Sequence, residues 1–125
     1  MTKAEEVEAL AKLADDRLGG ADLVVNNAGV ACGGVVGEIP LENWKWVIDV
    51  NLWGVIHGCH AFVPRMKKQG SGYVLNVASA AGLLCAPSMA PYNVTKAGVV
   101  ALSETLRGDL KPLGIGCTVL CPTLF

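Results

Sequence analysis

Tyr73-Val74-Leu75-Asn76-Val77-Ala78-Ser79 is the most informative segment for the fold class, because it is a short and nearly continuous apolar run bounded by turn-forming residues. Gly70-Ser71-Gly72 precedes it, and a loop of small residues follows. A run of this length that is apolar on successive residues is typical of a strand buried on both faces, as in a parallel sheet. Similar runs occupy residues 22–25 and 117–121. We therefore expect three buried strands.

Helical patterns separate these runs. Apolar residues recur at helical spacing over residues 2–18, over about 40–68 and over about 92–110. Gly54 and Pro64 are expected to bend the second of these helices. Each predicted strand is thus reached through a helix, which is the connection that parallel strands need. The sequence predicts an α/β fold with a three-layer parallel sheet, made of about three strands with three crossover helices.

The composition indicates one globular domain. The chain has 125 residues, a formal net charge of -1, 52% hydrophobic residues and 17% charged residues. It is too short for two domains and too apolar for a disordered chain. Its balanced charge favours no nucleic-acid partner and no anionic membrane surface. No stretch reaches the roughly 18 uninterrupted apolar residues of a membrane span.

The cysteines predict a reducing compartment. Their number is five, and no two of them form a Cys-x-x-Cys pair, which favours free buried thiols. The acidic first residues show no secretory signal pattern, so we expect a cytoplasmic protein. His57-Gly58-Cys59-His60 supplies two histidines and one thiol. That is an incomplete ligand set for zinc, and we expect no metal site.

Tyr92-Asn93-Val94-Thr95-Lys96 carries the first candidate for chemistry. Residues four apart on a helix lie on one face, one turn from each other. A cation at that distance favours a phenolate, so a tyrosine there is able to exchange a proton with a substrate oxygen. The alternative is that Tyr92 packs and Lys96 reaches solvent, and the pair alone does not decide between them.

Ser79 is the second candidate, because it directly follows a buried strand. A hydroxyl at that place is able to hold a carbonyl oxygen near the phenol. The alternative is a serine that caps the strand end or a turn.

Asparagines are the third candidate. Asn26-Asn27-Ala28-Gly29 follows the first strand, where paired asparagines commonly satisfy turn backbone. Asn51 lies inside an apolar helix, where asparagine is a poor helix former. It must therefore find a polar partner or mark a local distortion.

In this order and spacing, the motifs resemble those of the short-chain dehydrogenase/reductase family. The resemblance rests on Asn26-Asn27-Ala28-Gly29, Asn51, Asn76-Val77-Ala78-Ser79, Tyr92-x-x-x-Lys96 and a strand that ends at Pro122. It covers nearly the whole chain. It implies a Rossmann-type enzyme that moves hydride between NAD or NADP and a carbonyl or alcohol substrate.

The resemblance also implies roles for individual residues. Tyr92 would be the acid/base, and Ser79 would orient the substrate oxygen. Lys96 would bind the nicotinamide ribose and favour the phenolate of Tyr92, and Asn51 would hold a water that links Lys96 to solvent. The residues implied to bind the cofactor are Asn27, Ala28, Gly29, Tyr92, Lys96 and Pro122.

Parts of the family's pattern are not found in this sequence. The family's glycine-rich phosphate loop follows a strand, whereas the Gly-x-Gly sequences at residues 70–72 and 114–116 precede strands. The strand end that selects NAD or NADP is not found either, so the cofactor choice stays open. We expect residues 1–125 to form one partial Rossmann-type domain with impaired activity. The alternative is a non-catalytic remnant or dimerisation module of a longer reductase.

Substrate and assembly follow from the same resemblance. The apolar residues 83–89 and Val35-Val36 would border the nicotinamide pocket, which favours a lipophilic substrate. The helices around residues 51–68 and 92–110 would form a homo-oligomer interface. Candidate side chains for that interface are Trp53, His57, His60, Val100 and Leu106.

Overall fold

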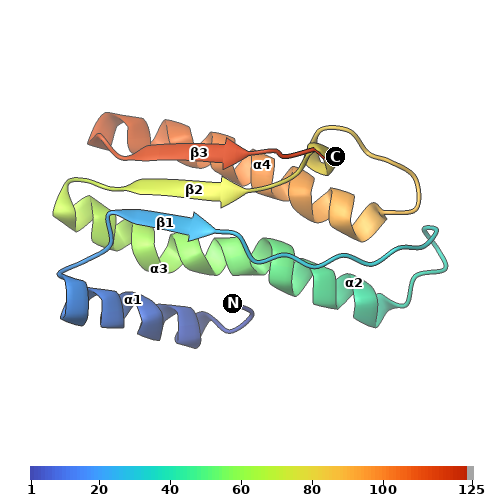
Figure 1. Cartoon of the computed structure of the whole chain (residues 1–125), viewed down its shortest axis with the longest axis horizontal. Coiled ribbons are helices and arrows are strands. Elements are labelled where there is room, and N and C mark those ends of the chain that lie inside the picture. The colour runs from blue at the N-terminus through green and yellow to red at the C-terminus, as the bar shows by residue number, and fades with distance from the viewer. Residues whose placement is uncertain (124–125) are drawn as a thin grey trace.

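The computed structural model describes residues 1–123. Helices and strands alternate along it, as the apolar periodicity predicts (Figure 1). The main elements are α1 (Ala4–Leu18), β1 (Leu23–Asn26), α2 (Leu41–Ile48), α3 (Gly54–Gln69), β2 (Tyr73–Val77), α4 (Ala90–Leu110) and β3 (Gly116–Leu120). Three short turns complete the order, namely the π-helical η1 (Asp49–Trp53) and the 3-10 turns η2 (Ala80–Gly82) and η3 (Lys111–Leu113).

The three strands form one parallel sheet in the order β1-β2-β3. Leu23 pairs with Tyr73, and Val74 pairs with Cys117. The carboxyl ends of all three strands therefore reach the same edge of the sheet (Figure 1). The predicted Rossmann-type parallel sheet with crossover helices is confirmed.

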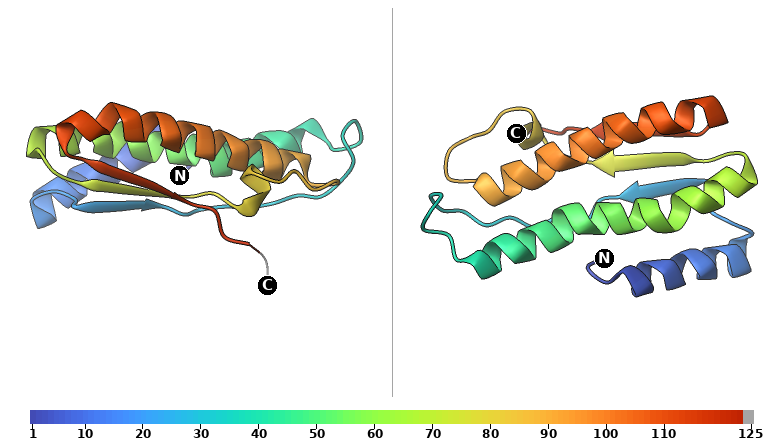
Figure 2. Two further views of the ribbon diagram at one scale, coloured as in Figure 1. Left: turned by 90° about the horizontal axis from the view of Figure 1, so that it is seen from above. Right: turned by 180° about the vertical axis from the view of Figure 1, so that it is seen from behind.

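The helices lie together on one side of the sheet (Figure 2). α3 and α4 cover the strands, and α1 packs beside α3. Between helices and sheet lies the apolar core, because alternate strand residues point toward the helices. Its buried members include Val7, Val24, Val55, Phe62, Met66, Val74, Val99, Leu110, Ile115 and Cys117.

The other face of the sheet is open within residues 1–123. Leu23 is 58% exposed, and Val25, Tyr73 and Leu120 on the same face are also exposed. The interpretation that each strand is buried on both faces is therefore wrong for the described part of the chain, which supplies two of the three predicted layers. The strand sequences are apolar on both faces. Such a pattern predicts that both faces of the sheet are buried, but it does not predict which segment buries each face.

The long helix predicted over about 40–68 is interrupted at Asn51. α2 ends at Ile48, a π-helical turn follows, and α3 begins at Gly54 and continues past Pro64. A π-helical turn inside a helix is rare overall, but the turns of this kind that do occur are often found at functional sites. Both options considered for Asn51 apply, because it marks this distortion and is fully buried with polar partners.

A chain of buried polar side chains ties the strands to α4. The Asn26 amide donates to Asn76 Oδ1 at 2.8 Å, and the Asn76 amide donates to Ser103 Oγ at 3.0 Å. We call Asn26, Asn76 and Ser103 the amide bridge. Asn26 and Asn76 are directly paired in the sheet register, so the bridge fixes β1 against β2 near their carboxyl ends.

All five cysteines are free, but only two are buried. Burial raises the pKa of the Cys59 thiol to about 11 and also raises the pKa of the Cys117 thiol. Cys85 is exposed, because it lies in the loop after β2 and not on an inward-facing strand or helix position. The prediction of buried thiols is therefore wrong for Cys85. Among residues 1–123, no helix is both long enough and apolar enough to cross a membrane.

Candidate active site

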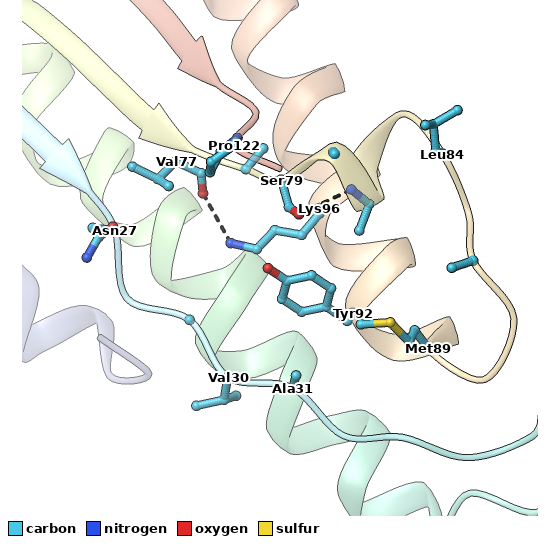
Figure 3. A pocket seen from close by; sticks show the side chains of 15 residues that line it. Asn27, Val30, Ala31, Val77, Ser79, Leu84, Met89, Tyr92, Lys96 and Pro122 are labelled. Carbon is cyan, nitrogen blue, oxygen red and sulfur yellow. Dashed lines mark hydrogen bonds between the residues drawn. The ribbon is translucent and has the colours of Figure 1, made fainter. Parts of the chain in front are cut away.

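A cleft of about 660 Å³ opens at the carboxyl ends of the strands. The loop after β1, the turn after β2 and the first turns of α4 form its walls (Figure 3). Ligands of open α/β sheets bind at this end. The lining is mostly apolar and comprises Asn27, Gly29, Val30, Ala31, Val77, Ala78, Ser79, Ala80, Ala81, Leu84, Ala86, Met89, Tyr92, Lys96 and Pro122.

Tyr92 and Lys96 lie on one face of α4, as their spacing predicts. Lys96 Nζ is 5.5 Å from the centre of the Tyr92 ring and donates to the main-chain oxygen of Val77 at 3.1 Å. Figure 3 shows the phenol oxygen and the ammonium group on the same side of the helix, both near the end of β2. Burial lowers the pKa of Lys96. The cleft thus holds a cation that is poorly hydrated and close to a phenol.

Ser79 lines the same cleft and also caps a turn. Its Oγ accepts a hydrogen bond from the Ala81 amide at 3.1 Å, at the start of η2. Accepting this bond does not consume the hydroxyl hydrogen, which stays available for donation. The two interpretations of Ser79 are therefore compatible, because the cap orients the hydroxyl that faces the cleft.

Gly82 sets how closely the Ser79 turn approaches α4. A Cβ at this position would lie 2.7 Å from the main-chain oxygen of Lys96. No side chain fits there without moving backbone atoms. Glycine at 82 therefore lets the turn that carries Ser79 pack directly against the helix that carries Tyr92 and Lys96.

Asn51 lies behind the cleft and does not line it. The Asn51 Oδ1 accepts from the Val30 amide at 2.7 Å, and its Nδ2 donates to the Val30 oxygen at 2.8 Å. The same Nδ2 donates to Thr95 Oγ1 at 3.2 Å. We call Val30, Asn51 and Thr95 the Asn51 clamp. The clamp joins the loop after β1, the π-helical turn and the first turns of α4.

Gly29 brings the clamp and the cation together. A Cβ at Gly29 would lie 3.5 Å from Lys96 Nζ and 3.7 Å from Asn51 Oδ1. Both polar atoms therefore face one small region, which the absence of a side chain at Gly29 keeps open.

The structure brings most of the predicted site residues to the cleft. Asn27, Gly29, Ser79, Tyr92, Lys96 and Pro122 line it. Ala28 is exposed in the loop after β1 and is not part of the lining, and Asn51 is buried behind it. Six of the eight predicted site residues thus lie together, because the carboxyl ends of parallel strands converge.

The apolar wall differs from the prediction. Leu84, Ala86 and Met89 of the predicted loop line the cleft, but Val35 and Val36 do not. Val30 and Ala31 take their place, because the loop after β1 runs along the cleft before it turns away, and Gly34 pairs with Met89 farther out.

The loop of residues 83–89 is held by hydrogen bonds from a main-chain amide and from a side-chain amide. The Gly34 amide donates to the Ser88 oxygen at 3.0 Å, and the Asn93 side chain donates to the Ala86 oxygen at 2.8 Å. The Ala86 and Met89 side of the cleft is therefore attached to both the β1 loop and α4.

Thr95 is the polar residue that sequence reasoning missed. It stands inside the Tyr92–Lys96 motif, three residues after the tyrosine and fully buried. Its position one turn from Tyr92 was readable from the sequence, whereas its contact with Asn51 depends on how α4 packs against the π-helical turn.

Comparisons with known proteins identify the family of the chain. The profile of the short chain dehydrogenase family matches residues 1–125. The chain is 37% identical over 122 residues to D-beta-hydroxybutyrate dehydrogenase of Rhizobium meliloti. The alignment covers 98% of this chain and 47% of that protein. It therefore spans about half the length of this curated relative.

Solved structures give the same picture. A short chain dehydrogenase/reductase of Burkholderia phymatum in complex with NAD is 44% identical with a TM-score of 0.95, over 98% of this chain and 45% of that one. A gluconate 5-dehydrogenase of Burkholderia cenocepacia in complex with NADP and tartrate is 30% identical with a TM-score of 0.93, over 99% and 49%.

Proposed function

The chain belongs to the short-chain dehydrogenase family, and from that premise we propose that it carries the reaction centre of an NAD(P)-dependent oxidoreductase acting on an apolar carbonyl or alcohol. One observation carries the proposal. A phenol, a buried ammonium group and a hydroxyl converge at the carboxyl ends of a parallel sheet, on Tyr92, Lys96 and Ser79.

Tyr92 is the proton donor for carbonyl reduction and the proton acceptor for alcohol oxidation. Lys96 places a positive charge beside the phenol, poorly screened because it is buried, and this charge stabilises negative charge that develops on the phenol oxygen during proton transfer. Ser79 donates its hydroxyl hydrogen to the same substrate oxygen and so holds it beside the phenol. Tyr92 and Ser79 thereby act on one substrate oxygen, and Lys96 acts on the phenol oxygen of Tyr92.

The residues present fit a nicotinamide nucleotide. The cleft combines the donor Nζ of Lys96, the amide of Asn27 and the open space over Gly29, which suits a hydroxyl-rich ribose. Pro122 lines the same cleft beside the Ser79 turn, where its main-chain oxygen accepts from the Ala80 amide at 2.9 Å (Figure 3). When bound there, the cofactor supplies or receives the hydride. Relatives in complex with NAD and with NADP support either cofactor for this chain.

Asn51 contributes to proton transfer through water. Both hydrogens of its amide are used by Val30 and Thr95, so Oδ1 is the side-chain atom that accepts from a water. Oδ1 and Lys96 Nζ both lie within 4 Å of the place where a Gly29 Cβ would be. A water in that region would link the ammonium group to the Asn51 side of the cleft.

The lining favours an uncharged, lipophilic substrate. Among the described residues that line the cleft, Lys96 is the sole cation, and Val30, Leu84 and Met89 are apolar. Hydrogen bonds from a cation are the strongest that a substrate carboxylate can accept, and Val30, Leu84 and Met89 offer it none. The similar Rhizobium protein is named for hydroxybutyrate, an acid, so a preference for neutral ketones would separate the two proteins.

The experiment that tests the proposal compares wild type with Tyr92→Phe. We expect wild type to oxidise NAD(P)H in the presence of neutral medium-chain ketones, and Tyr92→Phe to lose at least about a hundredfold in kcat. In NAD(P)H fluorescence titration, the Kd of Tyr92→Phe should differ from that of wild type by much less than kcat does, because only the phenol oxygen is removed and the other cofactor-binding residues remain. Equal turnover by the two proteins would reject Tyr92 as the acid/base, and failure of wild type to bind NADH or NADPH would favour a non-catalytic module.

A homo-oligomer in the cytoplasm completes the proposal. Trp53 is exposed on η1 and lies 5.6 Å from the His57 ring, between ring centroids, at the start of α3. An exposed tryptophan, here beside a half-buried histidine, is typical of a protein interface. Trp53→Ser should lower the mass measured by light scattering if α3 and α4 pair with a second copy, and an unchanged mass would exclude this surface.

A further inference from the structure

We propose that Thr95 is a positioning residue for proton transfer, because its hydroxyl couples Asn51 to the turn of α4 that carries Tyr92. Thr95 does not line the cleft and is fully buried. It cannot touch substrate or cofactor, so any effect on the reaction must pass through its partners. The proposal rests on the proposed function for its effect on turnover.

The Thr95 hydroxyl uses both of its hydrogen-bonding roles. It donates to the main-chain oxygen of Tyr92 at 2.9 Å and accepts from Asn51 Nδ2 at 3.2 Å. The first bond lies within α4, and the second reaches a different element. One oxygen atom therefore connects the helix to the π-helical turn.

Two other hydroxyls of α4 provide a comparison for these bonds. Ser103 donates to the Val99 oxygen and Thr105 donates to the Ala101 oxygen, both four residues back. Such bonds are the ordinary way for a hydroxyl to be satisfied inside a helix. Thr95 donates three residues back, which is an equally ordinary pattern, and like Ser103, which accepts from Asn76, it also accepts from an asparagine on another element. What distinguishes Thr95 is that its second partner, Asn51, bonds the loop that borders the cleft.

Through Asn51 the coupling reaches the wall of the cleft. Asn51 is held by both main-chain atoms of Val30, at 2.7 and 2.8 Å, and Val30 lines the cleft. Its Oδ1 also faces the region beside Lys96 Nζ. Thr95 thus fixes the Tyr92 turn relative to the segment that borders the Lys96 ammonium.

Substituting Thr95 by valine and by serine distinguishes the contribution of its hydroxyl from the contribution of its side-chain shape. Valine fills nearly the same space but leaves an Asn51 amide hydrogen without an acceptor in a buried place. Serine keeps the hydroxyl and loses only a methyl group. Thr105→Val removes a hydroxyl from the same helix at an exposed position and serves as the matched control.

The test measures amide hydrogen exchange and steady-state kinetics on Thr95→Val, Thr95→Ser and Thr105→Val in the whole chain. For Thr95→Val we expect the Val30 amide to exchange about tenfold faster, and kcat to fall about tenfold with the ketone KM within twofold. Thr95→Ser should restore both quantities to within about threefold of wild type. Thr105→Val should change neither.

Two outcomes would overturn the proposal. One is that Thr95→Val matches Thr105→Val in Val30 exchange and in kcat. The other is that Thr95→Ser is as impaired as Thr95→Val, which would assign the effect to the lost shape. If wild type shows no turnover, the proposed function fails, and Val30 exchange alone then decides the coupling. If Thr95→Val does not fold, Thr95→Ser against Thr95→Cys makes the same comparison, with the weak thiol donor expected to behave as impaired.

Discussion

The amide bridge and the Asn51 clamp are both buried polar clusters, but they lie at different distances from the cleft. The bridge joins β1, β2 and α4 on the face of the sheet that the helices cover, and each of its hydrogen bonds is between side chains. In the clamp, Asn51 bonds the main chain of the loop after β1 and the hydroxyl of Thr95. None of the bridge residues lines the cleft, whereas Val30 of the clamp does.

This difference separates stability from function. Buried polar groups destabilise a fold unless they are paired, so both clusters must stay intact for the chain to fold well. The bridge fixes strand register, and its loss should act on the whole domain. The clamp orients a loop and a helix turn beside the reacting groups, and its loss should act first on turnover.

Breaking the bridge by steric pressure should produce the largest effect. A Cβ at Gly58 of α3 would lie 2.1 Å from Asn26 Oδ1, so Gly58→Ala must displace either Asn26 or the helix. We expect the free energy of unfolding in urea to fall by about 3 kcal/mol, from overpacking and from the broken amide contact.

Gly108→Ala provides the matched control within a helix. Gly108 is exposed on α4, and a Cβ there would meet nothing within 4 Å. Alanine should raise the free energy of unfolding by about 0.5–1 kcal/mol, because it lowers the backbone entropy of the unfolded chain. Equal effects of the two substitutions would show that the contact with Asn26 is unimportant.

A smaller change in stability and a larger change in turnover should follow from Gly82→Ala. The added Cβ would press on the Lys96 oxygen and push the Ser79 turn away from α4. We expect a loss of about 1–2 kcal/mol in the free energy of unfolding, together with a fall in kcat of at least about tenfold as Ser79 moves from Tyr92.

Gly33→Ala tests whether any added methyl at this end of the molecule has the same effect. A Cβ at Gly33 would lie 3.6 Å from the Ser88 oxygen, an ordinary contact, so kcat should change by less than about twofold. If Gly82→Ala kept the turnover of Gly33→Ala, the placement of Ser79 would not depend on this close approach.

The sequence predicts the fold well where the pattern is local. The apolar runs around Val24, Val74 and Val119 give the strands, and the spacing of Tyr92 and Lys96 gives a shared helix face. These features depend on neighbours within one or two turns. The convergence of the site follows from them, because parallel strands bring their carboxyl ends to one edge.

What the sequence could not predict depends on packing between distant segments. Whether Asn51 would find a partner or distort its helix stayed open, because its partners Val30 and Thr95 lie 21 and 44 residues away. The replacement of Val35 by Val30 in the cleft wall depends on the path of an irregular loop. The open sheet face was missed because Leu23 and Tyr73 are as apolar as their buried neighbours.

The smallest expected effect is on the free energy of unfolding and concerns Lys96, whose burial in the cleft lowers the stability of the fold. Burial lowers the pKa of Lys96 from its ordinary value of 10.5, so the folded chain binds this proton less tightly than the unfolded chain does. Between the lowered value and 10.5, the unfolded state holds more protons, and stability attributable to Lys96 rises with pH.

Lys96→Met, which removes the charge, should therefore be more stable than wild type by a margin that is greatest near neutral pH and narrows as the pH approaches 10.5. Urea unfolding of both proteins along a pH series measures this margin, and the shared titration of other groups cancels in the difference. A margin that stays constant with pH would mean that burial has no net effect on the ammonium group, and one that widens would mean that the group is stabilised in the folded state. In either case the cation beside Tyr92 would be better solvated than its burial implies.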